Sequence, residues 1–210
     1  MLQLVLTALD APLAEAWKRH CGDFDFVSIE KRSILEVEAD ALVSPANSFG
    51  FMDGGIDLAY SNFFGWQLQA AVQARIQSRF DGELPVGAAD LVETGHLSFP
   101  WLVVAPTMRV PMALVNSPNP YLAARAAPVL LVNGKFETGP HAGDPISTRI
   151  ERVAFPGLGT GVGELSADVC ARQMRHAICS VLLGSVEFPR SWIQAQEIHY
   201  EMTRPSWRPP

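Results

Sequence analysis

The chain has 210 residues, of which 48% are apolar and 18% are charged. This length and composition predict a folded domain that buries its own core, and they exclude a disordered or low-complexity chain. The formal net charge is -6, and lysine occurs only at Lys18, Lys31 and Lys135. This balance argues against broad electrostatic binding to nucleic acid or to an anionic membrane, so any bound phosphate is expected to be held mainly by backbone amides.

The three cysteines, Cys21, Cys170 and Cys179, are too few and too irregularly spaced to predict a disulfide framework or a metal site. The N-terminal sequence MLQLVLTALD has no basic segment and no small-residue cleavage site. No apolar run approaches the roughly 18 residues that a membrane-spanning helix needs. We therefore expect a cytoplasmic protein with no membrane contact, no metal and no cofactor.

Apolar runs at residues 2–6, 25–29 and 41–46 are typical of buried strands. The segment at residues 10–20 has apolar positions compatible with a helix, so the chain is predicted to begin with a strand, helix, strand unit. Pro45 predicts that regular pairing of the third strand stops there, because proline cannot donate to the ladder.

The most regular helical pattern lies at residues 66–80, where apolar side chains recur at every fourth position. Gly82 follows as a stop signal. Residues 89–94 and 101–106 are predicted strands joined by a turn.

A further helix is predicted to begin with Asn119 as its N-cap, and Pro128 is expected to kink or end it. Residues 133–149 are dense in glycine, proline and aspartate, which predicts a long loop. Residues 150–155 form the last predicted strand.

Ser166 is predicted to cap the helix that follows, which runs to Gly184. Residues 1–185 are thus predicted to form one domain. Residues 186–210 are rich in tryptophan, arginine and proline, and we interpret them as a tail that lies on the surface or is partly disordered. A tail that binds a partner is the alternative.

Two segments share one design, in which an apolar strand runs into a glycine-containing loop and then into a helix. The first is ALVSPA followed by NSFGFMDGGID, and the second is VAF followed by PGLGTGVGE. In an open α/β sheet, ligands bind beyond the carboxyl ends of strands, and free amides at helix N-termini favour anions. Two such loops on adjacent strands could hold one diphosphate, although a tight turn would explain either loop alone.

Other catalytic signatures are absent from the sequence. The dinucleotide pattern GxGxxG fails because Val162 or Glu164 occupies the third glycine position, and no GK[ST] is present for a P-loop. There is no GxSxG and no HExxH, and the five histidines are scattered. Metal-dependent hydrolysis therefore has no support in the sequence.

Five blocks, taken in order, resemble the motifs of macrodomains: DALVSPANS, GGID, PVGAADLVETG, LVVAPTM and VAFPGLGTGVG. The common family forms are DAIVNAANS, GGGVD, GxAxxTxG, VIHTVGP and AFPxISTG. The resemblance covers roughly residues 25–184. It implies a three-layer α/β/α sandwich around a mixed, mostly parallel sheet, with ADP-ribose bound in a cleft at the strand ends.

The resemblance also implies which residues form the cleft. Asn47 matches an asparagine that contacts the distal ribose, and Asp57 matches the aspartate used by hydrolytic members, so these two are the candidate catalytic residues. Gly54 and Gly55 match glycines that line that ribose and its phosphate. The candidate ligand-binding residues are Ser33, Ile34, Ala46, Asn47, Gly54, Gly55, Ile56, Pro156, Gly157, Gly159, Thr160, Gly161, Val162 and Gly163.

Several positions depart from the family pattern. Ser33 stands where the family often has an aspartate that receives the adenine amino group, and a hydroxyl could accept the same hydrogen bond. Val162 and Gly163 stand where an aromatic residue is common, and Asp53 replaces a third glycine. Without the resemblance, Asp57 is better explained as the N-cap of a helix over LAYSNFF than as a catalytic residue.

Two functions remain open from the sequence. The first is a hydrolase that removes ADP-ribose from a macromolecule or processes small ADP-ribose derivatives. The second is a non-catalytic reader of ADP-ribose or a related nucleotide. Direct binding of nucleic acid is disfavoured by the acidic charge balance, except where the nucleic acid is itself the modified substrate.

Overall fold

A computed structural model describes residues 1–204 of the chain. Its centre is a six-stranded sheet with the order β2-β1-β6-β3-β5-β4, in which only β4 runs antiparallel to its neighbour. The strands are β1 (Gln3–Thr7), β2 (Val27–Glu30), β3 (Ala41–Ser44), β4 (Asp90–Glu93), β5 (Trp101–Val104) and β6 (Arg152–Phe155). Each lies within a run that the sequence predicts as a strand or overlaps its end, and β3 stops before Pro45 as expected.

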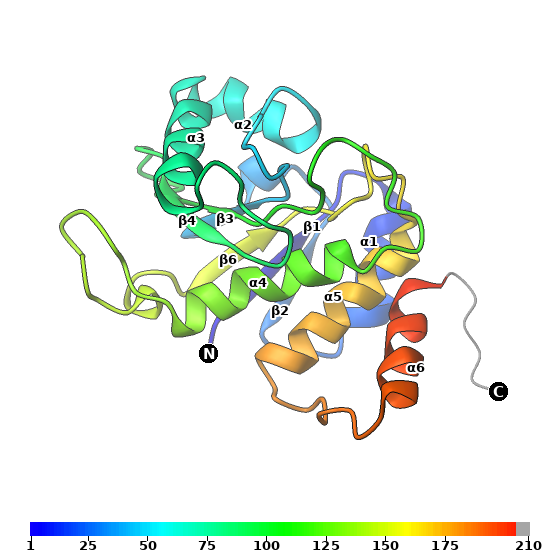
Figure 1. Ribbon diagram of the computed structural model, residues 1–210. Coiled ribbons are helices and arrows are strands. Elements are labelled where there is room, and N and C mark those ends of the chain that lie inside the picture. The colour runs from blue at the N-terminus through cyan, green and yellow to red at the C-terminus, as the bar shows by residue number, and fades with distance from the viewer. Residues whose placement is uncertain (205–210) are drawn as a thin grey trace.

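The helices cover both faces of the sheet (Figure 1). They are α1 (Ala11–Cys21), α2 (Gly55–Phe64), α3 (Gln67–Arg79), α4 (Asn119–Asn133), α5 (Ala167–Val181) and α6 (Trp192–Thr203), with short 3-10 turns η1 (Ile34–Glu36) and η2 (Ile146–Thr148). Helices α2 and α3 lie on one face, whereas α1, α4 and α5 lie on the other. The predicted three-layer α/β/α sandwich with a mixed sheet is confirmed.

The alternation of side chains along the strands explains the two layers. In β3, Val43 points into the core beneath α1, α4 and α5, and Leu42 points into the core beneath α2 and α3. Both side chains are fully buried. Strands covered on both faces need apolar residues at successive positions, which is why they are recognisable as continuous apolar runs.

Side-chain caps begin α1, α5 and α6, and the sequence predicted one of them, Ser166 of α5. Asp10 accepts a hydrogen bond from the backbone N–H of Leu13 at 2.8 Å at the start of α1. Ser166 accepts one from the N–H of Val169 at 3.4 Å at the start of α5. Each cap satisfies one of the free amides that every helix N-terminus presents.

The predicted start of α4 is wrong by one residue. Pro118 occupies the N-cap position and Asn119 is already helical, because the hydroxyl of Ser117 accepts the N–H of Asn119 at 3.2 Å and starts the turn earlier. Pro128 lies inside α4 without ending it. Pro128 is buried together with Ala126, Ala127 and Leu131 of the same helix, and the burial of these side chains offsets the hydrogen bond that proline cannot make.

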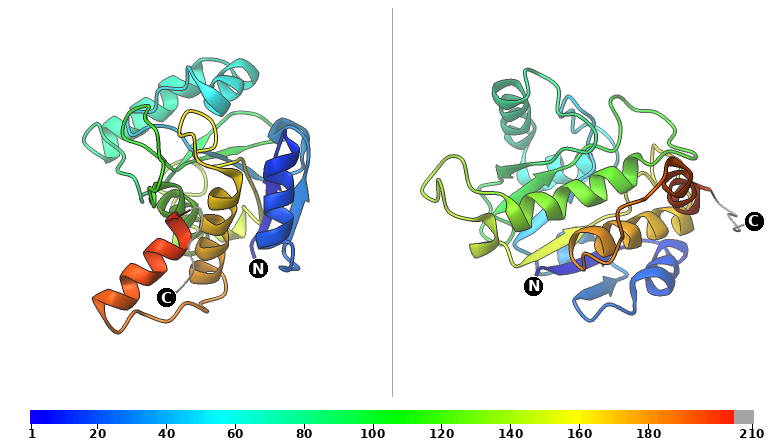
Figure 2. Two further views of the ribbon diagram at one scale, coloured as in Figure 1. Left: turned by 90° about the vertical axis from the view of Figure 1, so that its right-hand side faces the viewer. Right: turned by 60° about the horizontal axis from the view of Figure 1, so that its bottom comes forward.

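The C-terminal segment contains helix α6, which the sequence analysis did not predict. It packs alongside α5, on the side away from the sheet (Figure 2). Arg172 of α5 donates hydrogen bonds to the carbonyl oxygens of Glu201 and Arg204 at 2.6 and 2.7 Å, at the end of α6. The last six residues of the predicted tail, 205–210, lie outside the described part of the chain, and a domain boundary at residue 185 stays a prediction.

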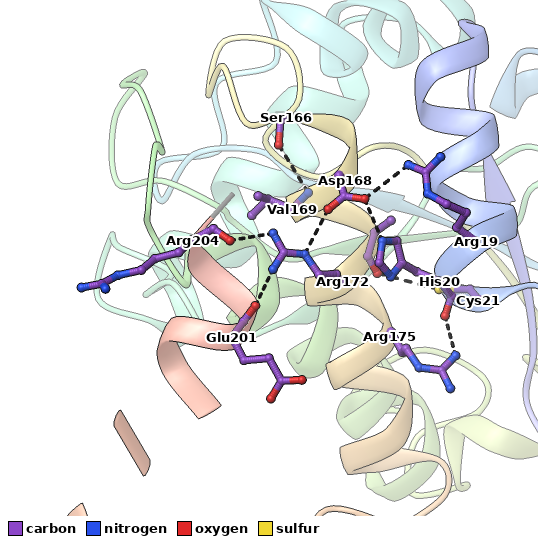
Figure 3. A network of polar contacts seen from close by, with 11 residues as sticks. Arg19, His20, Cys21, Ser166, Asp168, Val169, Arg172, Arg175, Glu201 and Arg204 are labelled. Carbon is purple, nitrogen blue, oxygen red and sulfur yellow. Dashed lines mark hydrogen bonds and ion pairs between the residues drawn. The ribbon is translucent and has the colours of Figure 1, made fainter. Parts of the chain in front are cut away.

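Asp168 connects this contact to the rest of the domain (Figure 3). Its carboxylate accepts from Arg172 at 3.1 Å, and it contacts the ring of His20 on α1 at 2.9 Å. Partial burial acts to raise the pKa of Asp168, but His20, Arg19 and Arg172 together outweigh it and hold this pKa below its usual range. Helices α1, α5 and α6 are therefore joined by one polar network.

Candidate functional site

A cavity of about 400 Å³ lies at the carboxyl ends of the parallel strands. The loops that follow β1, β2, β3, β5 and β6 all contribute to its wall. In the sheet order, β6 lies between β1 and β3, so the glycine-rich loop after β6 occupies the middle of the cavity. The loops after β1 and β2 form one end of it, and the loop after β3 forms the other.

The sequence-predicted site residues come together in this cavity. Its lining includes Ser33, Ile34, Ala46, Asn47, Gly54, Gly55, Ile56, Asp57, Pro156, Gly157, Gly159, Thr160, Gly161, Val162 and Gly163. The two loops that the sequence singled out thus face each other from adjacent strands, β3 and β6. Contact between these residues and a ligand stays a prediction.

The sequence analysis missed the contributions of two other strand ends. Leu9 and Asp10 line the cavity after β1, and Met108 and Pro111 line it after β5. None of these residues belongs to a glycine-rich motif. The available signal was the topology, because the ends of neighbouring parallel strands meet at one edge of the sheet.

The glycines of the loop after β6 serve two different purposes. Gly159 has a positive φ of 74°, and a Cβ there would come within 3.0 Å of the ring of Pro120, so this position is fixed by packing. A Cβ at Gly161 would meet no atom within 4 Å. Gly161 therefore leaves the wall of the cavity open to an approaching ligand.

Two sets of unpaired backbone amides border the cavity. Within residues 1–204, the N–H groups of residues 159–163 donate to no protein acceptor. Helix α2 begins at the opposite loop with Gly54 as its N-cap and no capping side chain, which leaves the N–H groups of Gly55 and Ile56 free. Free amides and the positive end of a helix dipole together favour an anion, and phosphate groups suit such a site.

Asn47 shapes the loop after β3. Its Oδ1 accepts from the backbone N–H groups of Phe49 and Phe51 at 3.1 and 3.2 Å, and its Nδ2 donates to the carbonyl of Phe51 at 2.9 Å. The side chain is nearly buried. One hydrogen of its amide group is left for a ligand, so Asn47 can fix the loop and contact a sugar hydroxyl together.

Asp57 is buried at the other end of the same loop, with 7% of its surface exposed. It lies in the first turn of α2, and since Gly54 is the N-cap, the alternative prediction that Asp57 caps this helix is wrong. Ser44, the last residue of β3, donates its hydroxyl to Oδ1 of Asp57 at 2.5 Å. Burial raises the pKa of Asp57 to about 7, and the hydrogen bond from Ser44 acts in the opposite direction. A carboxyl with this pKa can take up or release a proton near neutral pH.

Polar and apolar side chains both line the end of the cavity formed by the loops after β1 and β2. Ser33 caps η1 by accepting the N–H of Leu35 at 3.2 Å, which leaves its hydroxyl hydrogen free to donate. Arg32 also lines the cavity and forms an ion pair with Glu30 at 3.2 Å. Asp53, at the other end, is exposed on the cavity wall.

Residues 1–204 contain no cluster of three or more His, Cys, Asp or Glu side chains arranged to hold a metal ion. Over the same residues, no helix is both long and apolar enough to cross a bilayer.

The sheet topology and this cavity define the class of protein: an α/β sandwich with a cavity at the carboxyl edge of a mostly parallel sheet, which is where folds of this kind bind ligands. The Macro domain family model matches residues 43–174, a range that includes Asn47, Asp57 and the glycine-rich loop. The chain belongs to the Macro domain family.

Two relatives carry the description "uncharacterized protein". An uncharacterized protein from Aquifex aeolicus is 33% identical over 152 residues, which is 72% of this chain and 80% of that one. An uncharacterized protein from Aeropyrum pernix is 30% identical over 164 residues, or 78% of this chain and 75% of that one.

The fold is also shared with solved macrodomain structures. The macrodomain of Mycobacterium tuberculosis DarG has a TM-score of 0.56 at 21% identity, covering 76% of this chain and 95% of that chain. The Oceanobacillus iheyensis macrodomain with ADP has a TM-score of 0.58 at 18% identity, covering 81% and 86%. At these identities the likeness shows the fold.

Proposed function

We propose that this macrodomain binds ADP-ribose in the cavity at the strand ends and hydrolyses ADP-ribosyl linkages. The observation that carries the proposal is the position of Asp57, a buried carboxyl with a pKa of about 7 that lines the same cavity as two sets of free amides. The amides suit a diphosphate, and the carboxyl suits proton transfer at the sugar beside it.

The order of the strands suggests how the ligand lies. The diphosphate is placed on the amides of residues 159–163, because this loop is central and leaves Gly161 without an obstructing side chain. The distal ribose then extends toward Asn47, Gly54 and Asp57. The adenosine extends toward Ser33 at the opposite end.

Proton transfer by Asp57 would assist attack by water at the anomeric carbon of the distal ribose. The bond from the water oxygen to that carbon forms while the bond to the leaving group breaks. Asp57 accepts the proton that the water loses, and the leaving group takes up a proton as it departs. Asn47 holds the ribose hydroxyls in the reactive orientation. The substrate would be an ADP-ribosylated macromolecule or a small ADP-ribose derivative, met in the cytoplasm.

Structures of other macrodomains support this assignment. The Oceanobacillus iheyensis macrodomain has been solved with ADP and, as a variant, with ADPR, the latter at a TM-score of 0.57 and 18% identity over 72% of this chain and 75% of that chain. Variants of that protein replace a glycine, an asparagine or an aspartate. These three residues have the same spacing along the chain as Gly54, Asn47 and Asp57.

A reader that binds ADP-ribose without hydrolysing it is the second candidate. It is favoured by the hydrogen bonds of Asn47, whose side chain is largely occupied by its own loop. Nucleic acid enters either function only as a modified substrate, given the acidic charge balance.

Two measurements test the proposal. Calorimetric titration with ADP-ribose examines binding, and no detectable heat at millimolar ligand would rule out both functions. Release of ADP-ribose from mono-ADP-ribosylated substrates is then compared for the wild type and the Asp57→Asn variant, which keeps the shape of the side chain. Equal release by both proteins would remove Asp57 from the mechanism. Binding without release, over several linkages, would favour the reader.

A further inference from the structure

The side chain of Asp57 has one hydrogen-bond partner within residues 1–204, the hydroxyl of Ser44. Ser44 is fully buried at the end of β3, on the face of the sheet that α2 covers. The contact joins the last residue of a central strand to the first turn of the helix that follows it. Because this contact uses Oδ1, the second carboxyl oxygen, Oδ2, can contact a molecule in the cavity.

Among the described residues, no basic side chain forms an ion pair with Asp57. Arg32 is the one basic residue among those that line the cavity, and it lies beyond β2 in an ion pair with Glu30. From its own helix, Asp57 is faced by Tyr60, whose hydroxyl donates to the carbonyl of Val43 at 3.0 Å. The remaining ionisable groups on the wall are the carboxyls of Asp10 and Asp53, which disfavour a further negative charge.

We propose that Ser44 is the positioning residue of this site: its hydroxyl fixes the carboxyl of Asp57 in one orientation and stabilises the ionised form. A hydroxyl that donates to a carboxylate favours the charged form, whereas burial disfavours it. Burial raises the pKa of Asp57, and the hydroxyl of Ser44 is the side-chain donor that acts against it. The catalytic consequence rests on the proposed function, because only an ionised Asp57 can take a proton from water.

Ser44→Ala removes the donor and leaves the strand intact. Ser44→Thr keeps the hydroxyl and suits a strand, so it serves as the conservative variant. Ser61→Ala is the matched control, because Ser61 is a buried serine of α2 whose hydroxyl donates to the carbonyl of Met52 at 2.8 Å and does not contact Asp57. Any general effect of losing a buried hydroxyl appears in this control.

The deciding measurement is the titration of the Asp57 carboxyl by carbon NMR in the full chain, with Asp57→Asn to assign its signal. In Ser44→Ala the midpoint is expected to rise by about one pH unit, since the ionised carboxylate loses a hydrogen-bond donor that water replaces only in part. Ser44→Thr restores the wild-type midpoint, and Ser61→Ala does not move it. Equal midpoints in the wild type and Ser44→Ala, or an equal rise in Ser61→Ala, would overturn the proposal. If Ser44→Ala does not fold, Ser44→Cys offers a weaker donor for the same comparison.

A second readout follows the reaction itself. The acidic limb of the pH profile for ADP-ribose release moves to higher pH in Ser44→Ala by the same amount. The rate at pH values below the midpoint of this limb therefore falls about tenfold, and the rate at alkaline pH is retained. A uniform loss of rate at every pH would mark Ser44 as merely structural. If the NMR midpoint moves and the wild type releases no ADP-ribose, the hydrolase proposal fails while the role of Ser44 at Asp57 stands.

Discussion

Burying Asp57 should make the stability of the protein depend on pH in a way that one substitution removes. The fold raises the pKa of this carboxyl from 3.8 to about 7, so the folded state favours the protonated form. The stability that protonation provides is fully present below the unfolded pKa and is lost as the pH rises through the folded pKa. The contribution of Asp57 to the free energy of unfolding therefore changes with pH from acidic to slightly alkaline values.

The expected magnitude follows from that shift. About three pKa units at ~1.36 kcal/mol each give a cost of about 4 kcal/mol for ionising Asp57 in the folded state at alkaline pH. Between about pH 5 and about pH 8.5, roughly 2.5 kcal/mol of this cost develops. Asp57→Asn has no charge to bury and keeps an oxygen to accept from Ser44, so it avoids the cost.

The assay is urea unfolding of the wild type and Asp57→Asn at those two pH values. The difference in unfolding free energy, variant minus wild type, should grow by roughly 2.5 kcal/mol toward the alkaline value. Asp25→Asn is the control, because it removes an exposed carboxylate and leaves the buried one in place. The reasoning is refuted if the difference for Asp57→Asn stays constant with pH.

Further outcomes can be checked independently. Gly161→Val should weaken ADP-ribose binding at least tenfold in calorimetry without lowering the unfolding free energy, because its side chain would enter open space in the cavity. Gly159→Ala should instead destabilise the fold by about 1–3 kcal/mol in urea unfolding, owing to its positive φ and the close ring of Pro120. Equal effects of the two variants on binding and on unfolding free energy would contradict the different roles of the two glycines. ADP-ribose binding near pH 7 should be accompanied by proton uptake that Asp57→Asn abolishes, since an anionic diphosphate raises the pKa of Asp57 further. Calorimetric titrations in buffers of different ionisation enthalpy measure this uptake. Identical binding heats of the wild type in all buffers would refute the prediction. Arg172→Ala should lower the hydrogen-exchange protection of α6, because it removes the two hydrogen bonds to the end of that helix. ADP-ribose affinity should be unchanged, because Arg172 does not line the cavity. Unaltered protection would show that packing alone holds the helix.

The layers of the fold and the position of the cleft could be predicted from the sequence. Strands covered on both faces need continuous apolar residues, and such runs are visible in residues 41–46 and 150–155. The glycine-rich segments mark the places where the backbone turns at the ends of these strands. Because parallel strands end at one edge of the sheet, the two loops could be expected to face each other, as β3 and β6 do.

Local patterns were insufficient where a helix boundary depended on tertiary contacts. LAYSNFF suggests a helix that begins after Asp57, whereas α2 already begins at Gly55. Helix α6 has a mixed composition, and it is held by Arg172, which lies some thirty residues earlier in the chain. A cap or a carbonyl contact made by a distant residue leaves no signal in the segment itself.

The chemical state of Asp57 depended on the tertiary structure entirely. The sequence identified the residue, but its pKa follows from how completely the strand ends, α2 and the surrounding loops exclude water from it. The pairing with Ser44 likewise requires that β3 present this residue on the face that α2 covers. Desolvation and hydrogen-bond geometry are properties of packed groups in space, so the folded chain had to be seen before a carboxylate in a loop motif could be recognised as a group that titrates near neutral pH.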